Sequence, residues 1–98
     1  MKIARATARA YRLPLRERMV SSRFTMTHRE LVHLEIETDD GLTGTGWCTT
    51  AGVGAMAVHA LIDTYLAPTL IGEDPRNTER LWRRMWGECH AAGPAGIT

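Results

Sequence analysis

Cysteine is scarce in this sequence, which contains only Cys48 and Cys89 among its 98 residues. Two cysteines so far apart, with no Cys-x-x-Cys pair, exclude a disulfide framework. The sequence also lacks a secretory h-region and any apolar run long enough to cross a membrane. We therefore expect reduced thiols, a cytoplasmic location and no membrane partner.

Common catalytic motifs are also missing. The chain has neither a Gly-x-x-x-x-Gly-Lys phosphate loop nor a Gly-x-Ser-x-Gly nucleophile elbow. Of its four histidines only His90 is close to a cysteine, Cys89, and adjacent residues point to different sides of a regular element. A serine nucleophile at Ser21 or Ser22 has no identifiable base partner. The residues therefore predict no catalytic group and no metal ligand in this chain.

Positive charge is concentrated in the first third of the chain. Residues 1–29 contain eight Lys or Arg and one acid, whereas residues 30–98 contain four Arg and ten acids. An arginine-rich segment suits anionic substrates, nucleic acid or acidic lipid. We expect most of these arginines to lie on solvated strand faces and to pair with the later acids. No nucleic-acid partner is therefore predicted, and nucleic-acid binding is kept only as the weakest alternative.

A β-hairpin is predicted over residues 31–48. Apolar and polar residues alternate before the turn, which is the pattern of a strand with one buried face; the apolar set is Val32, Leu34 and Ile36. Asp40-Gly41 favours a tight turn in which both residues have positive φ. Gly44 and Gly46 in the return strand indicate close approach by another part of the molecule.

The segments before this hairpin are less clear. Residues 2–13 fit both a strand with an alanine face and a helical stripe, and Pro14 is expected to end the element in either case. Residues 15–28 show no clean period, so a long loop is predicted there. Arg18 and Arg23 in that loop suit a carboxylate, because the guanidinium fork matches its geometry. A mobile surface loop with solvated arginines is the alternative.

Two helices are predicted after the hairpin. The first covers residues 53–66, is capped by Thr49 or Thr50 and ends at Pro68. The second begins at Asp74-Pro75 and has an apolar stripe that includes Trp82 and Trp86, which are predicted to lie in the core. Residues 90–98 are predicted to be a connecting loop.

Five segments of this chain together form a specific pattern, although each alone is weak. They are MKI at the start, LPLR at 13–16, TDDGLTGTGW at 38–47, LIDTYLAPTLIGEDP at 61–75 and ERLWRRMW at 79–86. Together they resemble the N-terminal domain of the mandelate racemase/muconate lactonizing enzyme family of the enolase superfamily. The GTGW segment, followed by two threonines and small residues, looks most like the acid-sugar dehydratase and racemase members.

The resemblance implies an α+β fold, a three-stranded antiparallel meander followed by helices, and so implies a strand over residues 2–13. It implies that residues 1–98 are a capping domain, truncated before its last helix and the (β/α)7β barrel. In such enzymes the barrel holds the Mg²⁺ ligands and the bases that remove a proton α to the carboxylate, so none of these lie here. The implied partners are a small carboxylate such as an acid sugar, the protein's own C-terminal barrel and further copies in a homo-oligomer.

The family's capping domains contribute two loops that close the site and select the substrate. By position these loops match residues 16–28 and 47–54 of this chain. The predicted substrate-binding residues are Arg18, Ser22, Arg23, Phe24, Trp47 and Thr50. The implied function is substrate selection in a Mg²⁺-dependent sugar-acid dehydratase or racemase, in which this part alone is inactive. The alternative is a stand-alone α+β binding or interaction module without catalysis.

Overall fold

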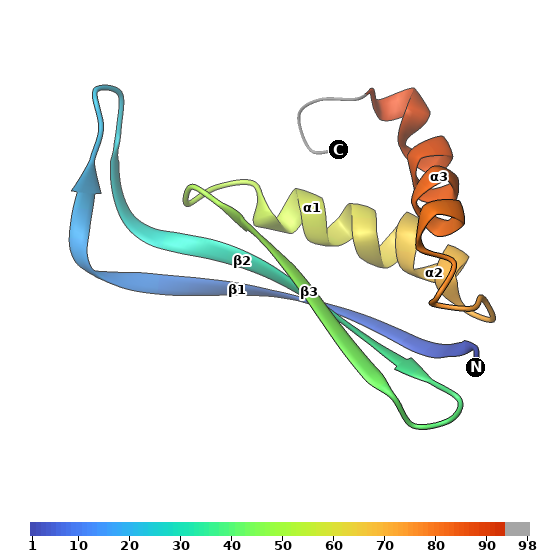
Figure 1. Cartoon of the computed structure of the whole chain (residues 1–98). Helices are drawn as coiled ribbons and strands as arrows, with labels where there is room; N and C mark the ends of the chain where they lie inside the picture. The colour runs from blue at the N-terminus through green and yellow to red at the C-terminus, as the bar shows by residue number, and fades with distance from the viewer. Residues whose placement is uncertain (94–98) are drawn as a thin grey trace.

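Three antiparallel strands in the order β1-β2-β3 form one sheet, and helices cover one of its faces (Figure 1). The strands are β1 (Ile3–Val20), β2 (Thr25–Thr38) and β3 (Thr43–Thr50). The structure is a computed structural model and describes residues 1–93. The predicted α+β meander is confirmed, and residues 3–13 lie in strand β1.

The helix-facing side of the sheet is built from small residues of β1 and apolar residues of β2. In the register, Ala6, Ala8 and Ala10 lie opposite Ile36, Leu34 and Val32. Val32 is 1% exposed, which confirms the buried face predicted for β2. Alanine on β1 leaves room for a helix to approach, and the ring of His59 makes a hydrogen bond with the Ala8 carbonyl at 2.9 Å.

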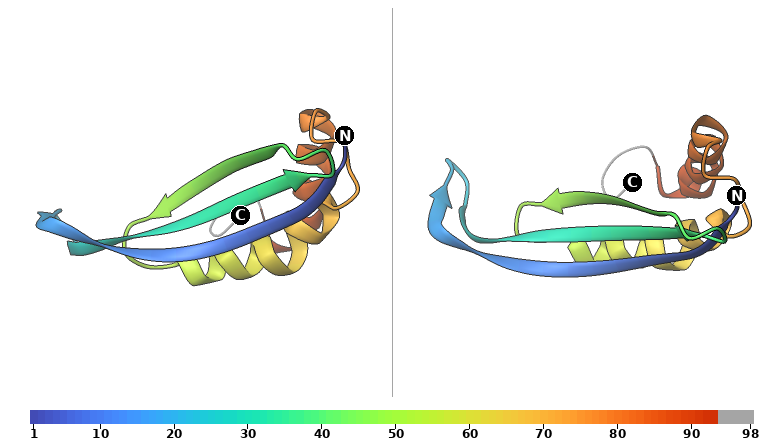
Figure 2. Two further views of the ribbon diagram at one scale, coloured as in Figure 1. Left: turned by 90° about the horizontal axis from the view of Figure 1, so that it is seen from below. Right: turned by 60° about the horizontal axis from the view of Figure 1, so that its bottom comes forward.

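The long loop predicted over residues 15–28 is wrong. β1 continues past Pro14 to Val20, and β2 begins at Thr25, so the segment is a two-stranded ribbon. Pro14 is tolerated because β1 is an edge strand, where one side of the backbone needs no partner. The pairing is irregular between Pro14 and Met19. At this end the ribbon bends away from the line of the sheet (Figures 1 and 2).

The turn between β2 and β3 lies where it was predicted, but its geometry is different. Gly41 has φ 88°, whereas no residue other than glycine has a positive φ in the described chain. Asp40 therefore does not adopt the expected left-handed conformation. Instead Thr38 closes a longer turn, because its Oγ1 accepts from the Leu42 amide at 3.0 Å.

A helical rod follows β3 and lies along the sheet (Figure 2). Its parts are α1 (Ala55–Leu61), the π-helical turn η1 (Ile62–Leu66) and α2 (Ala67–Leu70). Neither threonine caps it, since the N-cap is Gly54 with φ 101°. Pro68 does not end it either, because Pro68 lies in the first turn of α2, where its missing N–H costs little.

The last long helix, α3, spans Thr78–Cys89 and is followed by the 3-10 turn η2 (His90–Ala92). It begins later than predicted, because Asp74 and Pro75 form a separate turn and Asn77 is the N-cap. The remainder of the predicted tail loop, residues 94–98, lies outside the described residues.

The two tryptophans of α3 are not core residues of this domain, contrary to the prediction. Trp82 is 57% exposed and Trp86 is 49% exposed. Their rings stack on each other, with centroids 5.3 Å apart. Only Leu81 on this helix is buried, so α3 contacts the rest of the described chain through a narrower stripe than the sequence indicates.

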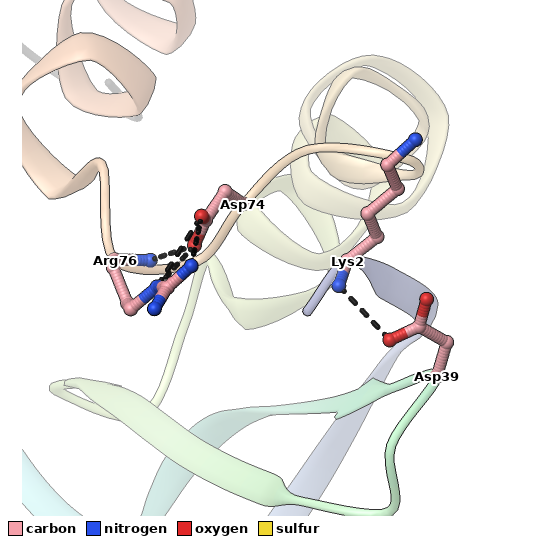
Figure 3. A network of polar contacts seen from close by, with 4 residues as sticks. All are labelled: Lys2, Asp39, Asp74 and Arg76. Atoms are coloured by element: carbon pink, nitrogen blue, oxygen red, sulfur yellow. Dashed lines mark hydrogen bonds and ion pairs between the residues drawn. The ribbon is translucent and has the colours of Figure 1, made fainter.

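The core lies where the first residues of β1 meet the helices. Ile3 packs with Leu70 and Leu81, and all three are buried. The backbone of Ile3 also donates to the Glu73 carbonyl and accepts from the Gly72 amide, each at 2.8 Å. On the other side, the Lys2 backbone amide donates to the Asp39 carboxylate at 3.0 Å (Figure 3). The start of β1 is therefore held from both sides.

We predict that Asp74→Asn destabilises the fold in a pH-dependent manner. Hydrogen bonds from Arg76 (Figure 3) lower the pKa of Asp74 to about 2. Because this folded-state pKa lies below the unfolded value of about 3.9, the carboxylate stabilises the fold above about pH 4, and this contribution is lost as the pH falls towards about 2. Thermal melts should show a lower Tm for the variant at pH 7 and convergence with wild type between about pH 4 and pH 2.

Glu79→Gln is the matched control, because it removes an ion pair with Arg83 in which both side chains are more than two-thirds exposed. Its effect on Tm at pH 7 should be small. A Tm difference for Asp74→Asn that stays constant from neutral to acid pH would contradict the assignment.

Candidate functional site

The tip of the β1–β2 ribbon is a tight turn that presents three of the predicted substrate-binding residues. Ser21 holds this turn, since its Oγ accepts from the backbone amides of Arg23 and Phe24 at 3.3 and 3.1 Å. The Ser21 and Phe24 backbones also pair at 2.8 Å. Ser21 is therefore a turn residue. Ser22, Arg23 and Phe24 are all exposed at this turn, and Phe24 is 51% exposed.

The ribbon is rich in arginines that have no acidic partner. Arg5, near the core, forms an ion pair with Glu37, but it is the only arginine of the first third that does so within residues 1–93. Arg16, Arg18 and Arg23 are exposed and make no ion pair with any described residue. The expectation that most of these arginines pair with later acids is wrong. Their charge remains available to an anion.

Trp47 and Thr50 both lie on β3, but they point to opposite faces of the sheet, because side chains alternate along a strand. Trp47 pairs with His33 on the open face and is 70% exposed. Thr50 pairs with Glu30 on the helix side, and its hydroxyl is enclosed without a hydrogen-bond partner among the described residues. The two residues therefore do not form one contact surface within this domain.

The loop after β3, residues 51–54, is attached to the ribbon by His28. The ring atom Nε2 of His28 lies 2.9 Å from the Gly52 carbonyl oxygen. On the other side of the ring, Nδ1 lies 3.2 Å from Nη2 of Arg12. Sequence spacing gave no reason to associate His28 with Gly52, which follows 24 positions later. Only the strand register brings them together.

The two predicted substrate loops are therefore joined at His28. Within residues 1–93, their outer residues are not joined by any such polar contact. No hydrogen bond or ion pair between described residues joins the tip, residues 21–24, to Trp47 or Thr50. The described part of the chain also contains no group of three or more His, Cys, Asp or Glu side chains that could hold a metal ion. The candidate site is therefore the pair of segments that the sequence predicts to face a substrate, joined at His28.

A second surface is apolar and lies on α3. A hollow of about 380 Å³ is lined mainly by Leu66, Trp82, Met85 and Trp86. Its lining, which also includes Cys89, His90 and Gly93, is mostly apolar, so it offers few hydrogen-bonding groups for a polar ligand such as a sugar acid. None of the described helices is long and apolar enough to cross a membrane.

Comparisons with known proteins agree on one family. The family model for the mandelate racemase/muconate lactonizing enzyme N-terminal domain matches residues 3–96. A 3,6-anhydro-alpha-L-galactonate cycloisomerase of Streptomyces coelicolor is 37% identical over 95 residues, which are 96% of this chain and 26% of that protein.

Solved structures give the same result for the fold. A racemase from Streptomyces coelicolor with bound magnesium has a TM-score of 0.93 at 36% identity, covering 97% of this chain and 27% of its own. The L-talarate dehydratase of Polaromonas sp., complexed with Mg and L-glucarate, has a TM-score of 0.90 at 27% identity, covering 98% of this chain and 27% of its own. The chain thus spans about a quarter of the length of these relatives.

Glycine substitutions should show whether the loop after β3, residues 51–54, rests on His28. Gly52 and Gly54 both have positive φ, but only at Gly52 would an added Cβ meet a neighbour, the His28 carbonyl oxygen at 3.3 Å. We predict that Gly54→Ala costs about 1–2 kcal/mol of unfolding free energy for the backbone strain alone, and that Gly52→Ala costs more. Urea titrations measure both values.

Gly46→Ala is the control, since Gly46 lies in β3 without a positive φ and an added Cβ would meet nothing within 4 Å. It should leave the unfolding free energy unchanged or raise it by up to about 1 kcal/mol, because alanine restricts the unfolded chain. Equal costs at Gly52 and Gly54 would show that the loop does not rest on His28.

Proposed function

This chain belongs to the mandelate racemase/muconate lactonizing enzyme family as its N-terminal domain, and from that premise we propose that it caps the active site of a larger sugar-acid enzyme. The relatives' lengths support a longer protein, since the chain covers only about a quarter of each. We propose that one further helix and a (β/α)7β barrel follow it. The relatives include a cycloisomerase and a dehydratase, so the reaction class proposed is isomerisation or dehydration of a sugar acid.

The observation on which this proposal rests is the set of unpaired arginines at the ribbon. Arg18 and Arg23 are exposed and make no ion pair with any described residue, while a tight turn holds the backbone of the tip. A guanidinium group matches a carboxylate with two parallel hydrogen bonds. A sugar acid presents such a carboxylate, and we assign its recognition to this pair, with Ser22 and Phe24 beside them.

The second contribution comes from β3 and the loop after it. We propose that Trp47 covers an apolar part of the substrate or of the barrel, because a side chain that is 70% exposed in this domain is otherwise left in water. Thr50 is assigned a substrate contact through its unpartnered hydroxyl. When both segments lie over the barrel they exclude water, and this strengthens the polar contacts beneath them.

Magnesium is assigned to the part of the enzyme beyond this chain. Magnesium prefers an octahedral set of oxygen ligands, and no group of metal-ligating side chains converges within residues 1–93. The residues described here therefore do not fit the ion, and we assign them only substrate binding and the exclusion of water. The bases that remove the proton α to the carboxylate are likewise proposed to lie outside this chain. Cytoplasmic location and homo-oligomer formation stay predictions.

The proposal is tested by Arg23→Ala in the complete enzyme. Loss of a charge-assisted hydrogen bond costs about 1.5–3 kcal/mol, so kcat/KM for the sugar acid should fall about ten- to hundredfold. A Mg²⁺-containing screen with L-glucarate, D-galactonate and D-mannonate identifies the substrate first. Steady-state kinetics then compare the variant with wild type.

Arg83→Ala is the matched control, because Arg83 is an exposed arginine on α3 whose partner is Glu79. Its kcat/KM should stay close to wild type. An Arg23→Ala enzyme with unchanged kcat/KM on its substrate would exclude Arg23 from substrate recognition. Absence of turnover with all three acids would remove the support for a sugar-acid enzyme.

A further inference from the structure

His28 has partners on both sides of its ring, and they belong to different segments. Nε2 faces the Gly52 carbonyl oxygen at 2.9 Å, in the loop after β3. Nδ1 faces Nη2 of Arg12 at 3.2 Å, on β1, with the Thr27 hydroxyl 3.4 Å away. The loop backbone also rests against this residue, since a Cβ on Gly52 would lie 3.5 Å from Nε2.

These partners are compatible with one tautomer of the ring. A backbone carbonyl only accepts hydrogen bonds, so Nε2 must carry a proton to bond with Gly52. A guanidinium group only donates, so Nδ1 must present its lone pair to Arg12. Both bonds exist together only in the neutral ring with the proton on Nε2. A proton on Nδ1 would place an N–H against the N–H of Arg12 and break that bond.

The hydrogen bond to Gly52 is also the only one between the ribbon, residues 15–28, and the loop, residues 51–54, within the described chain. Before these segments diverge, the regular pairing of β2 with β3 ends at Glu30 and Thr50. The ribbon bends away beyond this point, and the loop turns towards α1 (Figure 1). His28 therefore lies at the branch point of the two segments.

We propose that His28 is a positioning residue that couples the ribbon and the loop, so that the two segments close on the substrate together. This coupling role rests on the proposed function, because that function assigns substrate contacts to both segments. His28 itself touches no substrate in this proposal. It fixes the Gly52 carbonyl and the Arg12 side chain, and through them the relative placement of Arg23 and Thr50.

The test compares His28→Ala with His28→Gln in the complete protein. The amide nitrogen of Gln reaches about as far as Nε2 and donates the same hydrogen bond, so it should keep the bond to Gly52. His33→Ala is the matched control, because His33 lies on the same strand and makes no side-chain hydrogen bond with a described residue. A cooperative thermal melt with a Tm close to that of wild type shows that each variant folds.

Three measurements are made without assuming which sugar acid is the substrate. Imidazole ¹⁵N spectra of wild type identify the tautomer of His28, with the His28→Gln variant providing the assignment. Elastase cleavage after Val53, which is 79% exposed, reports detachment of the loop. Steady-state KM and kcat are measured with Mg²⁺ and L-glucarate, D-galactonate or D-mannonate.

We expect a single tautomer with the proton on Nε2. His28→Ala should raise both the cleavage rate and KM about tenfold, the effect of losing one hydrogen bond, with a smaller change in kcat. His28→Gln should restore both values, and His33→Ala should leave them unchanged. If His28→Ala acted only by destabilising the fold, glutamine at this position would not restore the cleavage rate and KM.

A proton on Nδ1, unchanged cleavage in His28→Ala or failure of His28→Gln to restore slow cleavage would overturn the coupling. Faster cleavage with an unchanged KM would overturn its role in substrate closure. Absence of turnover with all three acids would overturn the proposed function instead. In that case the tautomer and the cleavage rates still decide whether His28 couples the two segments.

Discussion

The structure depends on how the first residues of β1 are held. Ile3 is buried against Leu70 and Leu81, and its backbone bonds to the connector between α2 and α3 at both its amide and its carbonyl. One strand end thereby joins the sheet to both helical segments. Because a buried backbone group must be paired, this arrangement fixes the position of β1 as well as its packing. The rest of the 18-residue strand extends from this fixed end.

The length of β1 and β2 bears on the proposed substrate contacts. Both strands continue beyond the helices and carry the tip, with Arg23, and the nearby Arg18 out into solvent (Figure 2). A loop of the same length would sample many conformations, and ordering it on a ligand would cost conformational entropy. A paired ribbon has already lost that entropy on folding. Arg18 and Arg23 are thus presented on a preordered element, which suits the recognition of a small carboxylate.

Features that depend on local interactions could be predicted from the sequence, and features that depend on long-range pairing could not. The β2 face with Val32 and the turn at Gly41 were predicted because alternation and turn chemistry are local. The ribbon was missed because its pairing relies on cross-strand hydrogen bonds, which leave no periodic pattern when both faces are solvated. Trp82 was misplaced because an apolar stripe predicts burial without saying which part of the protein covers it.

The sequence by itself determined the family, the α+β order of elements and the two segments to which ligand contacts are assigned. These follow from local patterns and from short motifs that can be recognised without knowing the rest of the fold. Only the tertiary structure decided that the segments meet at His28 and that Trp47 and Thr50 face opposite ways. The physical reason is register: a side chain's face and partner depend on which residue lies across the sheet, and no property of the residue alone specifies that.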